Sequence, residues 1–144
     1  MNRLNRSAVA AFAVGLALGI APAYADMIKY KADLAAASEV PPTDSKATGS
    51  IEASFDTATK TLTWSGSYAG LTGPEAGAHF HGPAALGKNA GVLVPVEAAA
   101  SPFKGSAVLT DEQAKDFADG MVYFNVHTAK NKGGEIRGQM TAAK

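Results

Sequence analysis

The sequence predicts an all-β domain, an antiparallel sandwich or barrel of eight strands with one short helix. The main observation is period-two alternation of apolar and polar residues, in short stretches separated by turn residues at the intervals typical of such folds. The chain has 144 residues and 47% of them are hydrophobic, which suits one domain with a real core. It has no cysteine, so packing and hydrogen bonds rather than disulfides must stabilise the fold.

Eight stretches show the strand pattern. They are residues 28–35, 47–55, 61–69, 76–81, 92–96, 103–109, 121–127 and 135–141. The linker 56–60 is short enough to join its two flanking strands as a hairpin. Pro41-Pro42 excludes a regular strand and marks the first long turn.

One helix is predicted over residues 111–119. Thr110 can cap its start, and Gln113 occupies the position that completes a capping box. Gly120 can adopt the left-handed conformation that ends a helix.

The first 25 residues have the pattern of a secretory signal peptide. Arg3 and Arg6 precede a short apolar stretch that ends in the small-x-small site Ala23-Tyr24-Ala25. The apolar stretch is shorter than the roughly 20 residues that cross a bilayer. We therefore expect cleavage before Asp26, a single domain over residues 26–144, and a periplasmic or secreted protein with no membrane attachment.

The composition disfavours several functions. The formal net charge is zero, and removal of Arg3 and Arg6 would make it −2, whereas a nucleic-acid binder needs a basic face. The absence of cysteine excludes thiol chemistry and zinc sites built on cysteine pairs. No glycine-rich phosphate loop and no Gly-x-Ser-x-Gly motif is present.

All three histidines fall in two predicted strands, His79 and His81 in one and His127 in the other. Residues two apart in a strand point to the same side, with Cβ atoms roughly 7 Å apart, so two imidazoles can share a metal ion. Apolar Phe80 and Val126 occupy the opposite parity and should face the core. The histidines are therefore predicted metal ligands, with solvated surface histidines as the alternative.

A hairpin between the last two predicted long strands would place Glu135 and Arg137 on the histidine face. Glu135 is either a solvated edge carboxylate, the commoner case, or a carboxylate that orients an imidazole. Arg137 either draws a small anion toward the metal or holds an ion pair.

Three neutral imidazoles without a thiolate suit copper or zinc better than calcium or magnesium. Copper is preferred because it binds such ligands most strongly in the Irving–Williams order, although the residue types alone do not separate it from zinc. Three protein ligands would leave one coordination position open.

Several motifs, in order along nearly the whole chain after residue 25, resemble the CHRD (chordin-type) domain. They are Ser38-Glu39-Val40-Pro41-Pro42, Ala47-Thr48-Gly49, Gly70-Leu71-Thr72-Gly73-Pro74, Ala78-His79-Phe80-His81-Gly82-Pro83-Ala84, Asn125-Val126-His127-Thr128 and Gly133-Gly134-Glu135-Ile136-Arg137-Gly138-Gln139. The resemblance implies an extracytoplasmic β-sandwich. In animals such domains occur in matrix proteins that regulate growth-factor signalling, whereas for bacterial members the family name implies no settled activity.

The chain is more weakly similar to copper-zinc superoxide dismutases. There a Gly-Leu-Thr turn leads into a His-x-His strand, a late histidine completes the copper ligands and a following arginine guides the anion. This likeness implies a Greek-key fold, either immunoglobulin-like or dismutase-like, with His79, His81 and His127 on copper and Arg137 as a catalytic anion guide. A bridging histidine, a zinc site and the structural disulfide are missing, so only a copper-only version fits.

Two functions follow from the sequence. The first is an exported CHRD-domain protein that binds copper through three histidines, stores or buffers it, or uses it in dismutase-like redox chemistry on a small anion such as superoxide. The second is a non-enzymatic extracytoplasmic interaction or matrix module without metal, whose protein or glycan partner the sequence does not identify.

Overall fold

The computed structural model describes residues 25–97 and 99–144. The predicted signal segment therefore lies outside the described residues, apart from Ala25. Within the described part, no helix is long and apolar enough to span a membrane.

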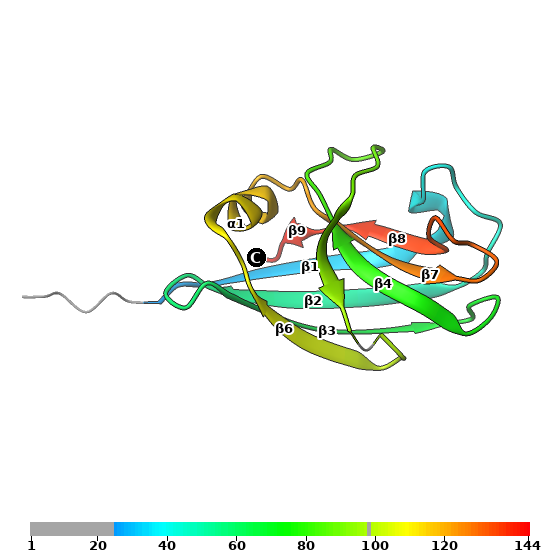
Figure 1. The fold of residues 1–144 in the computed structure, drawn as a ribbon, viewed down its shortest axis with the longest axis horizontal. Helices are drawn as coiled ribbons and strands as arrows, with labels where there is room; N and C mark the ends of the chain where they lie inside the picture. Colours follow the sequence, from blue (N-terminus) through cyan, green and yellow to red (C-terminus); the bar gives the residue numbers. More distant parts are fainter. Residues whose placement is uncertain (1–24, 98) are drawn as a thin grey trace, which may run out of the picture.

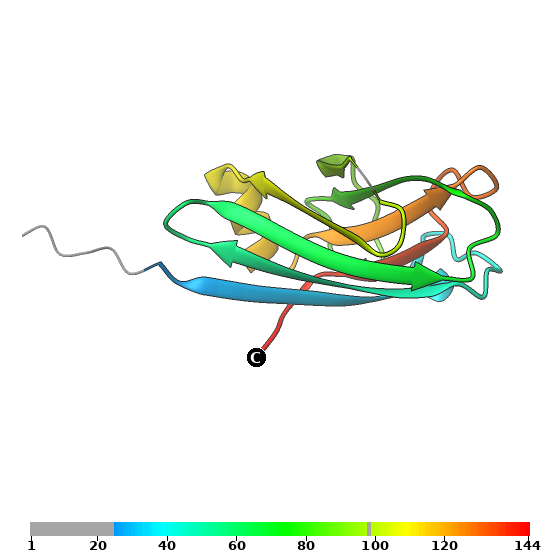
Figure 2. The same cartoon turned by 90° about the horizontal axis from the view of Figure 1, so that it is seen from below.

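The strands confirm the predicted all-β antiparallel fold, and each begins and ends within two residues of its predicted position. The longer ones are β1 (Met27–Ala35), β2 (Thr48–Asp56), β3 (Thr61–Ala69), β4 (Glu75–His81), β5 (Val92–Val96), β6 (Phe103–Val108), β7 (Tyr123–Thr128) and β8 (Ile136–Gln139). Their order in the sheet is β5-β4-β7-β8-β1-β2-β3-β6. The sheet curves into a nearly closed barrel, with β1, β2 and β3 facing β4 and β7 across the core (Figures 1 and 2).

The last predicted strand, residues 135–141, is divided in the structure. Glu135 precedes β8, and after Met140 the chain forms the short strand β9 (Thr141–Ala142). The strand β8 pairs with β7 and, at Arg137 opposite Ala35, with β1, whereas β9 pairs with β1 alone, opposite Tyr30 and Lys31. One stretch of alternation therefore serves two pairings, which the pattern itself does not reveal.

Both predicted hairpins are present. Strands β2 and β3 pair from Thr48 opposite Ala69 to Asp56 opposite Thr61, joined by the short turn after Asp56. Strands β7 and β8 pair with Asn125 opposite Arg137 and Tyr123 opposite Gln139. The second hairpin matters most for function, because β7 also pairs with β4, the strand that carries two of the histidines.

The helix α1 (Asp111–Ala118) begins with the predicted capping box. The Thr110 hydroxyl accepts a hydrogen bond from the Gln113 N–H, and the Gln113 side chain accepts one from the Thr110 N–H. Gly120 has a φ of 69°, as expected after a helix end. The helix lies at one end of the strands and packs Phe117 against Tyr30 and Phe80 (Figure 1). A short 3-10 helix, η1 (Ala36–Ser38), follows β1.

The core lies between the two halves of the sheet. Phe80 and Phe124 are fully buried in adjacent strands, with ring centroids 5.0 Å apart, and Trp64 packs edge-on against Phe80 from the opposite side. Because Phe80, Phe124 and Val126 point inward, residues of the other parity on β4 and β7 point outward. The histidines lie on this outward parity, as predicted.

Candidate metal centre

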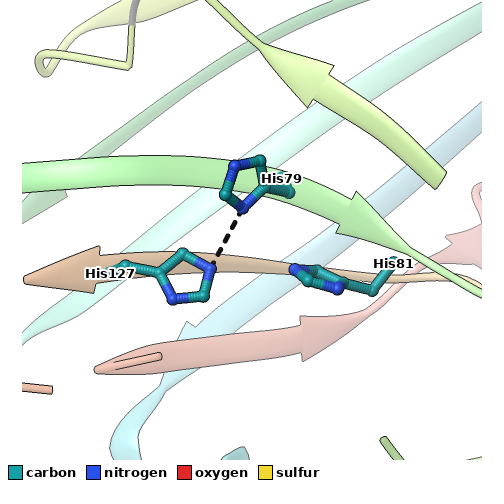
Figure 3. Close-up of side chains that lie close together, drawn as sticks. All are labelled: His79, His81 and His127. Carbon is teal, nitrogen blue, oxygen red and sulfur yellow. Dashed lines mark hydrogen bonds between the residues drawn. The ribbon is translucent and has the colours of Figure 1, made fainter. Parts of the chain in front are cut away.

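Strands β4 and β7 bring the three histidines together through their register. His127 lies opposite Gly77, one diagonal step from His79, while His81 lies opposite Tyr123. Diagonal neighbours in an antiparallel pair remain within reach of ring side chains. The ligand nitrogens of His79, His81 and His127 all lie within 4.8 Å of one another (Figure 3). Across residues 25–97 and 99–144, they form the one group of three or more His, Cys, Asp or Glu side chains with ligand atoms arranged in this way.

Gly77 lies opposite His127 and close to the His79 ring. Its φ of 150° is a backbone conformation that residues with a side chain rarely adopt. A Cβ atom built there would lie 3.4 Å from His79 Cε1, which is an ordinary van der Waals contact. The backbone conformation of β4, rather than a lack of space beside His79, therefore favours glycine at this position. Gly77 was not singled out from the sequence.

Hydrogen bonds to main-chain carbonyls set the tautomers of two imidazoles. His81 Nδ1 lies 3.1 Å from the Ala90 carbonyl oxygen, and His127 Nδ1 lies 2.9 Å from that of Lys132. A carbonyl oxygen only accepts, so each Nδ1 carries a hydrogen, and in the neutral imidazole Nε2 then keeps the lone pair. Such bonds on the distal nitrogen are typical of metal-binding histidines.

His79 completes the cluster through its own Nδ1, which lies 3.1 Å from His127 Nε2. Because His127 Nε2 carries a lone pair, His79 Nδ1 donates the single proton that links the two rings. His81 Nε2 is buried and has no hydrogen-bond partner. The three nitrogens that face one another are therefore His79 Nδ1, His81 Nε2 and His127 Nε2 (Figure 3).

The surroundings favour neutral imidazoles. Burial lowers the pKa of His79 below its usual value, and the nearby His127 lowers it further. Burial likewise lowers the pKa of His81, against the opposing effect of its hydrogen bond to the Ala90 carbonyl. A neutral imidazole is the form that ligates a metal.

Glu135 contradicts both sequence expectations for it, because it is neither a solvated edge carboxylate nor the partner of an imidazole. It is fully buried, immediately before β8. Its oxygens accept hydrogen bonds from the side chains of Ser45, Thr72, Thr128 and Asn131 and from the Thr72 N–H. Burial alone would raise the pKa of Glu135, but the hydrogen bonds lower it to about 2. The carboxylate holds three loops together.

Arg137 is likewise buried, with 1% of its surface exposed. Its guanidinium donates to the Asn89 side chain at 2.9 Å and to the Lys88 carbonyl at 2.6 Å. The expectation that Arg137 would face outward from the sheet is met, but the loop of residues 82–91 covers that side. The guanidinium therefore presents no open surface to an incoming anion.

Glu39 is a buried carboxyl group within the Ser38-Glu39-Val40-Pro41-Pro42 motif, and no site role was predicted for it from the sequence. It is 5% exposed, and Oε1 has no hydrogen-bond partner among the described residues. Burial raises the pKa of Glu39 to about 7, although the charge of Arg137 opposes this rise. Gly134 makes room for it, because a Cβ there would overlap Glu39 Oε1. Only tertiary structure reveals this burial, since the segment around Glu39 has no regular periodicity.

A family model for the CHRD domain matches residues 30–140, a span that includes every strand from β1 to β8 except the first residues of β1. The chain belongs to the CHRD-domain family. Searches of curated proteins and of solved structures gave no match. The CHRD domain of this protein therefore carries the histidine cluster on the outer side of its own β4–β7 pair.

Proposed function

We propose that this CHRD-domain protein is exported and binds one copper ion through His79 Nδ1, His81 Nε2 and His127 Nε2. The observation that carries the proposal is the convergence of three ring nitrogens, two of them lone-pair donors and one linked to its neighbour by a single proton. A bound cation would take the place of that proton, and His79 would carry its proton on Nε2 instead, so that the ring stays neutral.

The distances fit a mononuclear site. Metal–imidazole bonds of about 2.0–2.1 Å place the ligand nitrogens of one ion roughly 3 to 4 Å apart. The spacing of His79 Nδ1 and His127 Nε2, 3.1 Å, is already in this range. The other nitrogens lie within 4.8 Å, so small ring rotations would complete the site.

Copper suits the donor set best, because imidazole ligands bind it most strongly in the Irving–Williams order. Bound copper would exchange single electrons with a small oxygen species such as superoxide at a position that the three histidines leave open. The residues of this chain contribute ligation, neutral imidazoles and a partly buried surround. Because Arg137 is covered by residues 82–91, we do not assign it the guidance of an anion.

Metal binding is tested by elemental analysis of the exported protein and by titration of the metal-free protein with Cu(II). We expect one copper per chain in the wild type and an affinity loss of at least about a thousandfold in His79→Ala/His127→Ala, since loss of partners that only orient ligands already weakens binding 10–100-fold. Glu75→Ala, on the same strand but beyond the irregularity between Glu75 and Gly77, is the control and should bind one equivalent.

Equal, negligible uptake by wild type and the double variant would overturn the proposal and favour the metal-free interaction module. Export is checked by intact mass of the protein recovered from the periplasm or medium. A mass that retains residues 1–25 would contradict cleavage of the predicted signal peptide.

A further inference from the structure

Tyr123 lies between Arg137 and the histidine cluster. Its Cζ atom is 3.4 Å from the centroid of the Tyr123 ring, within the range of a cation–π contact. On its other face the Tyr123 ring stacks on the His81 ring, with centroids 4.8 Å apart and an angle of 4° between the planes. Guanidinium, phenol and imidazole therefore form three stacked layers.

The loop of residues 82–91 links the same groups a second time. Its Lys88 carbonyl and Asn89 side chain accept hydrogen bonds from Arg137. Its Ala90 carbonyl accepts from both the His81 Nδ1 and the Tyr123 hydroxyl, at 3.1 and 3.2 Å. Arg137 thus holds both supports of His81, the ring stacked on it and the loop that fixes its tautomer.

The Arg137 charge has no close counter-ion. Among the described residues, no carboxylate lies within salt-bridge distance of it, and Glu39 acts on it only at longer range. Because the side chain is 1% exposed, water screens its field less than at the surface. A positive charge near a metal favours the oxidation state with the lower charge.

We propose that Arg137 is a positioning residue of the metal centre, which clamps Tyr123 and residues 82–91 against His81 and whose charge favours Cu(I) over Cu(II). This inference rests on the proposed copper site. With the metal roughly 10 Å from the guanidinium and an effective dielectric constant near 20, Coulomb's law gives about a tenfold bias between the two oxidation states.

The test compares Arg137→Met, which removes the charge and the two N–H groups that donate to Asn89 and Lys88, with Arg137→Lys, which keeps the charge. Lys130→Met removes an exposed lysine from the β7–β8 turn and is the charge-matched control. Two properties are measured: the Cu(II)/Cu(I) midpoint potential of the copper-loaded protein, and hydrogen exchange of the amides of residues 84–91 in the metal-free protein.

We expect Arg137→Met to reduce the ratio of Cu(I) to Cu(II) affinity about tenfold, a fall of about 59 mV for one electron. Arg137→Lys should stay within about threefold of wild type in this ratio, because the charge remains. Both variants should exchange the loop amides faster, since a lysine cannot form the same pair of bonds. Lys130→Met should change neither property.

An unchanged potential in Arg137→Met, or an equal fall in Arg137→Lys, would overturn the role of the charge. Unchanged loop exchange in both variants would overturn the positioning role. If Arg137→Met does not fold, the Arg137→Lys variant decides alone: faster loop exchange with a retained potential supports the inference, and a tenfold change in the ratio contradicts it. Absence of copper binding by wild type would refute the proposed function instead, and loop exchange in the metal-free protein would still test the positioning.

Discussion

Two clusters of polar side chains with opposite character lie beside the β7–β8 hairpin, one around Glu135 and one where β7 pairs with β4. Glu135, immediately before β8, is fully buried, and both its oxygens accept at least two hydrogen bonds. The cluster of His79, His81 and His127 leaves His81 Nε2 without a partner and joins the other two rings by one shared proton. Residue type alone would have made a carboxylate as good a functional candidate as an imidazole. The difference is that one cluster has satisfied all its bonding capacity and the other has not.

The largest expected effect is on the free energy of unfolding when Glu135 is replaced. Glu135→Gln places an amide NH2 group among hydroxyl and N–H donors, and we expect a loss of about 3 kcal/mol in the free energy of unfolding at pH 7. Because the pKa of Glu135 is about 2 when folded and near 4.5 when unfolded, its stabilisation is complete above pH 4.5 and is lost as the pH falls toward 2. The difference from wild type should shrink over the same range.

Urea denaturation measures this change, with Glu52→Gln, an exposed residue of β2, as the matched control. The control should stay within about 0.5 kcal/mol of wild type. If Glu135→Gln lowers the free energy of unfolding by less than about 1 kcal/mol, the hydrogen bonds of Glu135 do not stabilise the fold as expected.

Glu39 Oε1 has no hydrogen-bond partner among the described residues, so replacing Glu39 should change stability in the opposite direction from replacing Glu135. Its pKa is raised to about 7 by burial, so its effect on stability is complete below pH 4.5 and stability is lost as the pH rises toward 7. Glu39→Gln should therefore be about 1–2 kcal/mol more stable than wild type at pH 8 and show no such gain at pH 4. Thermal or urea unfolding at the two pH values measures it; a variant less stable than wild type at pH 8 would show that the Glu39 charge is well solvated.

The pH dependence of copper affinity tests whether the histidine cluster, rather than a carboxylate, provides the ligands. The ligating form of histidine is neutral, and the pKa values of His79 and His81 are lowered. Copper affinity should stay constant from about pH 8 to about 6.5 and fall about tenfold or more by pH 5. Competition with a chelator of known pH dependence measures it, and constant affinity down to pH 5 would exclude imidazole ligation.

The smallest expected effect is on the stability of the metal-free protein when the histidines are removed. His79→Ala/His127→Ala deletes the hydrogen bond between the two partly exposed rings and the exposed one from His127 to the Lys132 carbonyl, and the free energy of unfolding should change by less than about 1 kcal/mol. The same variant should lose copper binding. A loss as large as that of Glu135→Gln would show that the histidines serve mainly to hold the fold.

The sequence predicted the strands, the capped helix and the outward parity of the histidines, because each follows from local periodicity or spacing. It did not predict what covers the outward side of β8. Arg137 was expected at the open face, yet Lys88 and Asn89, nearly fifty residues away in the chain, enclose it. Parity tells which side of a sheet a residue occupies, whereas burial there depends on loops whose paths alternation does not encode.

The hydrogen-bonded cluster around Glu135 could not be predicted from the sequence for the same reason. Ser45, Thr72 and Asn131 come from three separate loops and meet only at Glu135. Serine, threonine and asparagine are ordinary turn residues, so none of them signals a buried carboxylate. The histidines were easier to predict because they are rare in this chain and lie on regular strands.

The most direct test of the central claim is an anomalous-scattering map from crystals of the copper-loaded protein. We expect one copper peak per chain, about 2.0–2.1 Å from His79 Nδ1, His81 Nε2 and His127 Nε2. A peak elsewhere, or a map without a peak beside these three nitrogens, would contradict it.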